Sequence, residues 1–150
     1  MNIVPIPAFS DNYIWMLQRD GRVAVVDPGD ANPVLAVLKE RGVTLDTIII
    51  THHHFDHTGG VKTLKAETNC QVVGPDNPKI EGIDEKLVDG DVANVLGYDF
   101  DVLEVPGHTL DHIALHCADE SVLFCGDTLF VGGCGRVFEG TLNEMFNSLK

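Results

Sequence analysis

A short segment, residues 51–60, concentrates the side chains that could do chemistry. It reads T-H-H-H-F-D-H-T-G-G, so four histidines and one aspartate fall within six consecutive positions. In an extended loop His52 and His54, two residues apart, point to the same side. Asp56 and His57, at the turn into a following helix, would then face a neighbouring point. Imidazole and carboxylate ligands suit a borderline cation such as zinc, so the segment predicts a metal site.

Two later segments deliver the same kinds of ligand at the ends of predicted strands. The strand Thr47–Thr51 leads into the His-rich segment, Val102–Val105 leads into His108, and Val122–Cys125 leads into Asp127. Ligands in α/β proteins commonly lie at the carboxyl ends of strands, so these three ends are expected to converge on one site. A solvent-exposed cluster of histidines, the simpler interpretation, predicts neither a strand before it nor further ligands after similar strands.

The elements that must position these ligands are short. Strands are predicted at 13–17, 22–26, 47–51, 71–73, 100–105, 113–117 and 122–125. One helix is predicted at 33–41, where Asn32 could cap and Pro33 lies in the first turn, and another after Gly60. A third begins at Thr141, which forms a capping box with Glu144. Residues 82–97 read as hairpins, and the whole pattern predicts an α/β protein with mixed sheets.

Composition limits the partners that the chain can have. Its 150 residues, 44% of them apolar, are enough for one domain with a real core. A formal net charge of -13 disfavours nucleic acid and anionic membranes as partners. The chain has no basic, apolar start of the signal-peptide type and no run of about 18 apolar residues. Its four cysteines form no Cys-x-x-Cys pair, and we expect a cytoplasmic protein with reduced thiols.

Residues Thr51–His57 match the T-H-x-H-x-D-H motif of the metallo-β-lactamase superfamily. Nearly the whole chain also resembles the N-terminal part of the glyoxalase II family, the hydroxyacylglutathione hydrolases. That closer resemblance rests on the blocks Ile6–Phe9, Asp11–Trp15, Val26–Asp30, Pro106–Thr109, Phe124–Phe130 and Gly133–Gly140. It implies that residues 1–150 form a metallo-β-lactamase-like αββα sandwich, incomplete at the C-terminus. The family's last metal-ligand strand and its C-terminal helical domain are not in the sequence.

The resemblance implies two bound Zn²⁺ ions, with iron and manganese as alternative metals. The implied ligands are His52, His54 and His108 for the first ion, Asp56 and His57 for the second, and Asp127 as a bridge between both. We also expect Asp56 to be a catalytic residue. The second ion is expected to bind more weakly, since the family's remaining histidine ligand is missing. Arg136 and Phe138 are implied as contacts of the glutathione moiety.

The resemblance implies hydrolysis of a glutathione thioester, S-lactoylglutathione, to lactate and glutathione by a metal-bound hydroxide. A thiol leaving group with a pKa of about 8.5 departs without a dedicated proton donor, which an amine would need. Loss of the family's C-terminal part would impair this activity. Two alternatives stay open: a persulfide dioxygenase with a single iron, and a non-catalytic metal-binding fragment. An open sheet edge would also favour self-association.

Four residues near the motif have supporting or uncertain roles. His53 is expected to point away from the neighbouring ligands. Asp27, at a strand end, could accept a hydrogen bond from a liganding imidazole, and His112 could support the ligands in a similar way. Asp111 departs from the small residue usual in the family. Turned inward it would add negative charge near the cleft, and turned outward it would do nothing.

Overall fold

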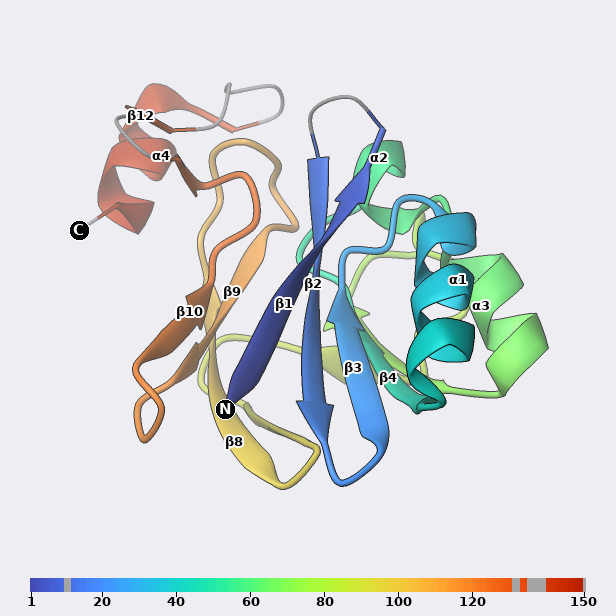
Figure 1. The fold of residues 1–150 in the computed structure, drawn as a ribbon. Coiled ribbons are helices and arrows are strands. Elements are labelled where there is room, and N and C mark those ends of the chain that lie inside the picture. The colour runs from blue at the N-terminus through green and yellow to red at the C-terminus, as the bar shows by residue number, and fades with distance from the viewer. Residues whose placement is uncertain (10–11, 131–132, 135–139, 150) are drawn as a thin grey trace.

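The computed structural model describes residues 1–9, 12–130, 133–134 and 140–149 and shows two β-sheets packed face to face (Figure 1). The larger sheet has the order β1-β2-β3-β4-β5-β6, and the smaller has the order β10-β9-β8-β7. The strands of the larger sheet are β1 (Asn2–Ala8), β2 (Asn12–Arg19), β3 (Arg22–Val26), β4 (Thr44–Ile49), β5 (Gln71–Pro75) and β6 (Glu85–Leu87). Those of the smaller sheet are β7 (Val92–Val95), β8 (Tyr98–Glu104), β9 (Ile113–Cys117) and β10 (Val122–Phe124).

Four helices and one short ribbon complete the described chain. They are α1 (Ala31–Arg41), α2 (Phe55–Thr58), α3 (Val61–Thr68), α4 (Leu142–Ser148) and the pair β11 (Leu129–Phe130) with β12 (Gly133–Cys134). Helices α1 and α3 cover the outer face of the larger sheet, and α4 lies beside the loop that connects β8 to β9 (Figure 1). The layers confirm the predicted α/β sandwich. No helix in the described part of the chain is long and apolar enough to cross a membrane.

Two apolar layers hold the sandwich together, and strand alternation divides residues between them. Along β3, Val23 and Val25 pack under α1 and α3, whereas Ala24 and Val26 face the smaller sheet. Successive strand side chains point to opposite faces, so a strand buried on both faces reads as a continuous apolar run. The layer between the sheets includes Phe100, which is fully buried.

Parallel pairing sends several loops to one rim of the molecule. Strands β3, β4 and β5 pair in parallel, so the loops that follow them leave from the same edge of the larger sheet. In the smaller sheet β8 and β10 both run antiparallel to β9, so their following loops also leave together. The loops after β4, β8 and β10 are those for which the sequence predicted metal ligands.

Three sequence predictions need correction. Helix α1 begins at Ala31, two residues earlier than predicted, because Asp30, not Asn32, is the N-cap, and its side chain accepts a hydrogen bond from the Asn32 amide. Residues 82–97 do not form hairpins among themselves: β6 pairs in parallel with β5 in the larger sheet, and β7 forms a hairpin with β8, which extends to Glu104. Strand β1 was not predicted. The capping box of Thr141 and Glu144 is confirmed.

Candidate metal centre

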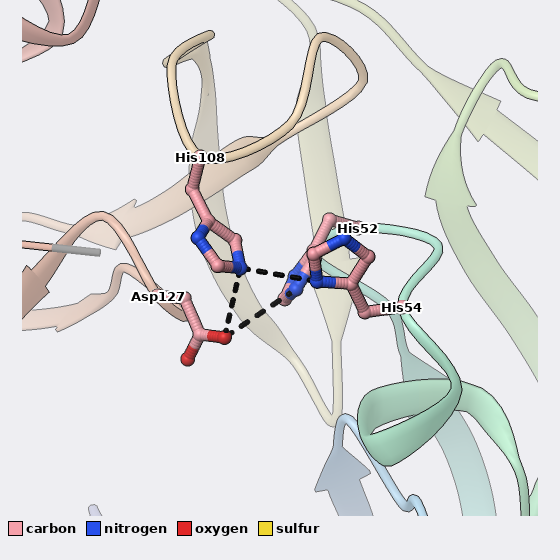
Figure 2. A group of neighbouring side chains, drawn as sticks. All are labelled: His52, His54, His108 and Asp127. Carbon is pink, nitrogen blue, oxygen red and sulfur yellow. Dashed lines mark hydrogen bonds and ion pairs between the residues drawn. The ribbon is translucent and has the colours of Figure 1, made fainter. Parts of the chain in front are cut away.

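Three histidines and one aspartate converge at the rim (Figure 2). His52 and His54 come from the loop after β4, His108 from the loop after β8, and Asp127 from the loop after β10. The His108 Nε2 atom lies 3.1 Å from His54 Nδ1 and 3.2 Å from Asp127 Oδ2. The His52 Nε2 atom lies 3.6 Å from the same carboxylate oxygen. One ligand-type atom of each residue lies within 4.8 Å of the others, a spacing that a single cation could bridge.

A second group adjoins the first and shares Asp127 with it. The His57 Nε2 atom lies 3.1 Å from Asp127 Oδ2 and 3.4 Å from Asp56 Oδ2. His57 is buried, whereas the Asp56 side chain is half exposed at the mouth of the site. Because the Oδ2 atom of Asp127 faces both groups, two neighbouring cations could share it.

The buried imidazoles offer a test of whether these residues fit a metal. The Nε2 atoms of His52 and His57 are buried, and within the described residues neither makes a hydrogen bond. Asp127 lies close to both atoms but forms an ion-pair contact with them, not a hydrogen bond. A buried polar atom without a partner costs about 1–3 kcal/mol, and a cation bound by the two lone pairs would remove that cost. The donor set of imidazoles and carboxylates therefore fits a divalent metal.

Asp27 and Thr51 fix which nitrogen of each imidazole carries a proton. Asp27 Oδ2 lies 3.0 Å from His57 Nδ1 and accepts a hydrogen bond from the Thr51 hydroxyl at 2.6 Å. Since this hydroxyl donates to Asp27, its oxygen can accept from His52 Nδ1, which lies 3.0 Å away. In their neutral forms both histidines can then present an Nε2 lone pair to a cation, as liganding imidazoles with a hydrogen-bonded second nitrogen do. The supporting role predicted for Asp27 agrees with this geometry.

Charges within this cluster shift the pKa values of its members. Burial raises the pKa of the Asp127 carboxyl, but His52 and His57 outweigh burial and hold it well below its usual range. Burial likewise opposes ionisation of Asp27, yet His57, His52 and the Thr51 hydrogen bond keep its pKa lowered. For His57, burial lowers the pKa, but the carboxylates of Asp127 and Asp27 raise it to about 10. Without a metal, His57 therefore carries a second proton at neutral pH and is positively charged.

His112 contacts two of the predicted ligands, the ring of His52 and the backbone of Asp127. Its ring stacks on His52 with centroids 4.5 Å apart and planes at 12°. Its Nδ1 lies 3.0 Å from the Ile113 carbonyl oxygen, and its Nε2 accepts a hydrogen bond from the Asp127 backbone amide at 3.1 Å. Burial and the neighbouring His52 lower its pKa to about 3, so it stays neutral with the proton on Nδ1. Both nitrogens are occupied, so His112 supports the site without joining a ligand group of the described residues.

Glycines let the loop after β3 approach the His-rich segment. A Cβ added to Gly29 would overlap the backbone oxygen of Asp56, and one added to Gly60 would lie 2.6 Å from the Ala31 amide nitrogen. Asp27 itself has a positive φ of 53°, a conformation that aspartate tolerates better than most residues. This tight backbone contact brings the Asp27 carboxylate within reach of His57.

The structure brings all six predicted metal ligands to the rim. These residues are His52, His54, Asp56, His57, His108 and Asp127. The predicted substrate contacts, Arg136 and Phe138, lie outside the described residues. Asn12 is a residue that the sequence analysis missed: its side-chain amide donates to Asp56 Oδ2 at 3.0 Å and to the Asp56 backbone oxygen at 3.2 Å. The Asp11–Trp15 block contained the signal, but no spacing rule connects it to a residue 44 positions away.

The structure contradicts both orientations, inward and outward, that the sequence left open for the Asp111 side chain. Its side chain turns neither toward the ligand groups nor out to solvent. It is largely buried and accepts hydrogen bonds from His53, Asn77 and Thr109. Burial raises the pKa of its carboxyl, but these three hydrogen bonds lower it below the usual value. His53 itself points to Asp111, as expected for a residue between two ligands.

A cavity of about 590 Å³ lies beside the second ligand group. Its lining includes the polar side chains of Asn12, His57 and Asp127 and the apolar side chains of Trp15 and Phe124. A cavity of this size, lined by apolar side chains and a few polar groups, is typical of a small-molecule site.

The fold and the site together define an α/β sandwich with a candidate metal centre of histidines and aspartates clustered at one rim. A family model of the metallo-β-lactamase superfamily matches residues 8–150, and the chain belongs to this superfamily. A relative from Ectopseudomonas mendocina (strain ymp), named hydroxyacylglutathione hydrolase, is 56% identical over 99% of this chain and 59% of its own length. This confirms the predicted resemblance to glyoxalase II. The chain spans about 60% of the length of the curated relatives it matches.

Solved structures show the same fold. The crystal structure of BLEG-1, a B3 metallo-β-lactamase, has a TM-score of 0.89 and 25% identity, covering 99% of this chain and 83% of that one. TTHA1623, solved in a di-iron-bound form, has a TM-score of 0.83 and 25% identity, covering 97% of this chain and 83% of that one. The same sandwich therefore occurs in a protein that binds two iron ions.

Proposed function

We propose that residues 1–150 form one metallo-β-lactamase-like domain that hydrolyses glutathione thioesters, with S-lactoylglutathione as the substrate, in the cytoplasm. What carries the proposal is 56% identity, along nearly the whole chain, to a protein named hydroxyacylglutathione hydrolase. A fold alone would not, because one fold supports many chemistries. The orphaned imidazole nitrogens and the shared Asp127 oxygen support a metal-dependent reaction.

In this proposal each residue of the centre has a defined task. His52, His54 and His108 would hold one Zn²⁺ ion and His57 with Asp56 the other, while Asp127 would serve both. Bound divalent ions lower the pKa of water to about 7 and polarise a carbonyl group. The remaining tasks belong to side chains outside the ligand set.

Three supporting side chains keep those ligands in place. Asp27 holds the Nδ1 proton of His57, and His112 holds the backbone of Asp127. Asn12 fixes the half-exposed carboxylate of Asp56, the predicted catalytic residue, at the mouth of the site. Arg136 and Phe138 are proposed as contacts of the glutathione moiety.

Hydrolysis of S-lactoylglutathione tests this function directly. We expect turnover by the chain as purified, loss of turnover after chelation, and recovery when Zn²⁺ is returned. Release of glutathione, followed with a thiol reagent, is the measurement, and elemental analysis of the same sample gives the metal content. Parallel samples reloaded with Fe²⁺ or Mn²⁺ identify the metal that gives the highest rate.

Other outcomes would favour the two alternatives. Oxygen uptake with glutathione persulfide and one iron per chain would indicate a dioxygenase. Bound metal without turnover of either substrate would indicate a non-catalytic metal-binding domain. A chain that binds no divalent metal at all would remove the basis of the proposal.

We also propose that the isolated chain self-associates through the exposed inner face of β2 and the unpaired edge of β10. On the inner face of β2, Leu17 is buried, but Trp15 and Tyr13 on the same face are 40% and 58% exposed. Among the described residues, β10 pairs with β9 alone, so its other edge is open. Exposed apolar faces and unpaired edges favour association.

Light scattering over a range of protein concentrations tests self-association. We expect the average mass to rise with concentration and the variant Trp15→Lys to shift the chain toward monomer. A monodisperse monomer at all concentrations in the unsubstituted chain would contradict the expectation.

A further inference from the structure

A buried carboxylate next to the ligand groups ties three loops together. Asp111 lies in the β8–β9 connection, three residues after His108, and its side chain is 8% exposed. Its Oδ1 accepts hydrogen bonds from the Thr109 hydroxyl at 2.6 Å and from His53 Nδ1 at 3.0 Å. Its Oδ2 accepts one from the Asn77 side-chain amide at 3.0 Å. These donors belong to its own loop, to the loop after β4 and to the segment after β5.

These hydrogen bonds connect the loops after β4 and β8, which also carry the three histidines of the first ligand group. His53 stands between His52 and His54 on a loop of the larger sheet, whereas Asp111 shares a loop of the smaller sheet with His108. The His53–Asp111 bond therefore joins the two loops whose imidazoles meet at 3.1 Å, between His54 Nδ1 and His108 Nε2. A metal site of high affinity needs its ligands held to within about 0.5 Å, so such a tie has a direct effect on binding.

A backbone contact already joins the bases of these two loops. The Ile113 amide donates to the Thr51 carbonyl oxygen at 2.9 Å, just after β4 and at the start of β9. One such bond leaves the loops able to rotate about it. Asp111 adds a second attachment nearer to the ligands, and Asn77 braces it from a third direction.

The position calls for a carboxylate. An ionised carboxylate accepts with both oxygens and donates with neither, which matches three converging donors. A small side chain here would leave His53 Nδ1, the Asn77 amide and the Thr109 hydroxyl without this acceptor in a largely buried place. Asp111 is in none of the ligand groups formed by the described residues, so it acts through its neighbours.

We propose that Asp111 is a positioning residue that sets the separation of the His54 and His108 loops and so strengthens metal binding by His52, His54, His108 and Asp127. The inference rests on the proposed metal-binding function. It extends that function by assigning a specific role to a residue outside the ligand set. The second group, Asp56 with His57 and Asp127, lies on the other side of Asp127 and depends less on this tie.

Asp111→Ala and Asp111→Asn test the inference against a matched control. Asp84→Asn removes the same charge from a carboxylate that also holds structure, since it accepts from Lys65 Nζ at 2.7 Å and from the Val72 amide at 2.8 Å. Zn²⁺ affinity is measured by competition with a chelator of known affinity, and Co²⁺ absorption reports the ligand geometry. We expect both Asp111 variants to weaken the tighter site at least about tenfold, as loss of a supporting partner does, and to alter the Co²⁺ spectrum. The control should bind within twofold of the unsubstituted chain.

A second readout needs no metal. In the metal-free chain, amide hydrogen exchange in residues 51–58 and 107–112 should speed up in the Asp111 variants and stay unchanged in Asp84→Asn. If the Asp111 variants fail to fold, His53→Ala removes one tie and keeps the carboxylate paired with Thr109 and Asn77. It should then lower metal affinity by a smaller factor.

The outcomes separate this inference from the proposed function. Unchanged affinity and unchanged exchange in a folded Asp111→Ala chain would overturn the role of Asp111. If the unsubstituted chain bound no metal, the proposed function would fail and the affinity role with it. Faster exchange in both loops would then show that the tie exists without serving a metal.

Discussion

Replacing Asp127 by asparagine is expected to lower thioester turnover at least about a hundredfold and to leave less than one metal ion per chain. The Oδ2 atom of Asp127 lies 3.2 Å from His108 Nε2, 3.1 Å from His57 Nε2 and 3.6 Å from His52 Nε2. An asparagine keeps the shape but offers a neutral oxygen, so both ligand groups lose a negative charge at once. Elemental analysis after gel filtration and the glutathione-release assay measure the two effects.

Asp119→Asn provides the control for this variant. Asp119 is exposed in the turn between β9 and β10, so its substitution removes one charge without touching the rim. We expect its metal content and turnover to match those of the unsubstituted chain. An Asp127→Asn chain that kept two metal ions and full turnover would show that the shared oxygen is not the bridge of the centre.

Ligand convergence could be predicted from sequence because each ligand follows a recognisable strand. The apolar runs before His52, His108 and Asp127 define strand ends, and the alternation of an extended loop places His52 and His54 on one side. Both rules act over a few residues. They therefore hold without knowledge of the tertiary structure.

Strand β1 was missed for a local reason. Its sequence contains Pro5 and Pro7, which cannot donate to a sheet and argue against a central strand. In the structure β1 is an edge strand that pairs with β2 alone within the described residues, so one row of its backbone groups needs no partner. An edge position tolerates proline, but the sequence gives no indication that this strand is at an edge.

The interactions of Asp111 and Asn12 at the rim escaped prediction because they join distant residues. Asp111 bonds to residues 34 and 58 positions away, and Asn12 reaches Asp56 across 44 positions. No periodicity or motif encodes such pairs. The sequence could thus supply the ligands of the centre and two of their supports, Asp27 and His112, whereas the roles of Asn12 and Asp111 became visible only in the fold.

Without metal, the chain is expected to be most stable near pH 6.5 and to lose stability on both sides. His57 has a pKa of about 10 in the folded chain against an ordinary value of 6.5. Its contribution is therefore complete below pH 6.5 and is lost as the pH rises toward 10. His112, with a pKa of about 3, behaves in the opposite way. It contributes above pH 6.5, and this contribution is lost as the pH falls toward 3.

Other groups also make the folded chain less stable as the pH falls. Burial and the neighbouring His52 and His108 lower the pKa of His54. As the pH falls, His54 therefore takes up a proton more readily in the unfolded chain than in the folded chain, which lowers the free energy of unfolding. The lowered pKa values of Asp27 and Asp127 remove further stability below their ordinary value of 3.8. Each group with a full proton difference changes the free energy of unfolding by up to about 1.4 kcal/mol per pH unit.

Urea unfolding of the chelated chain between pH 5 and pH 9.5 measures this profile, and His57→Asn isolates its alkaline side. That variant should lose much less stability than the unsubstituted chain between pH 7 and pH 9, because the group that holds the extra proton is gone. Zn²⁺ should also release a proton on binding to the unsubstituted chain at pH 7.5, since the imidazole of His57 must be neutral to act as a ligand. A flat profile between pH 7 and pH 9, with no proton release, would mean that His57 is already neutral between its two carboxylates.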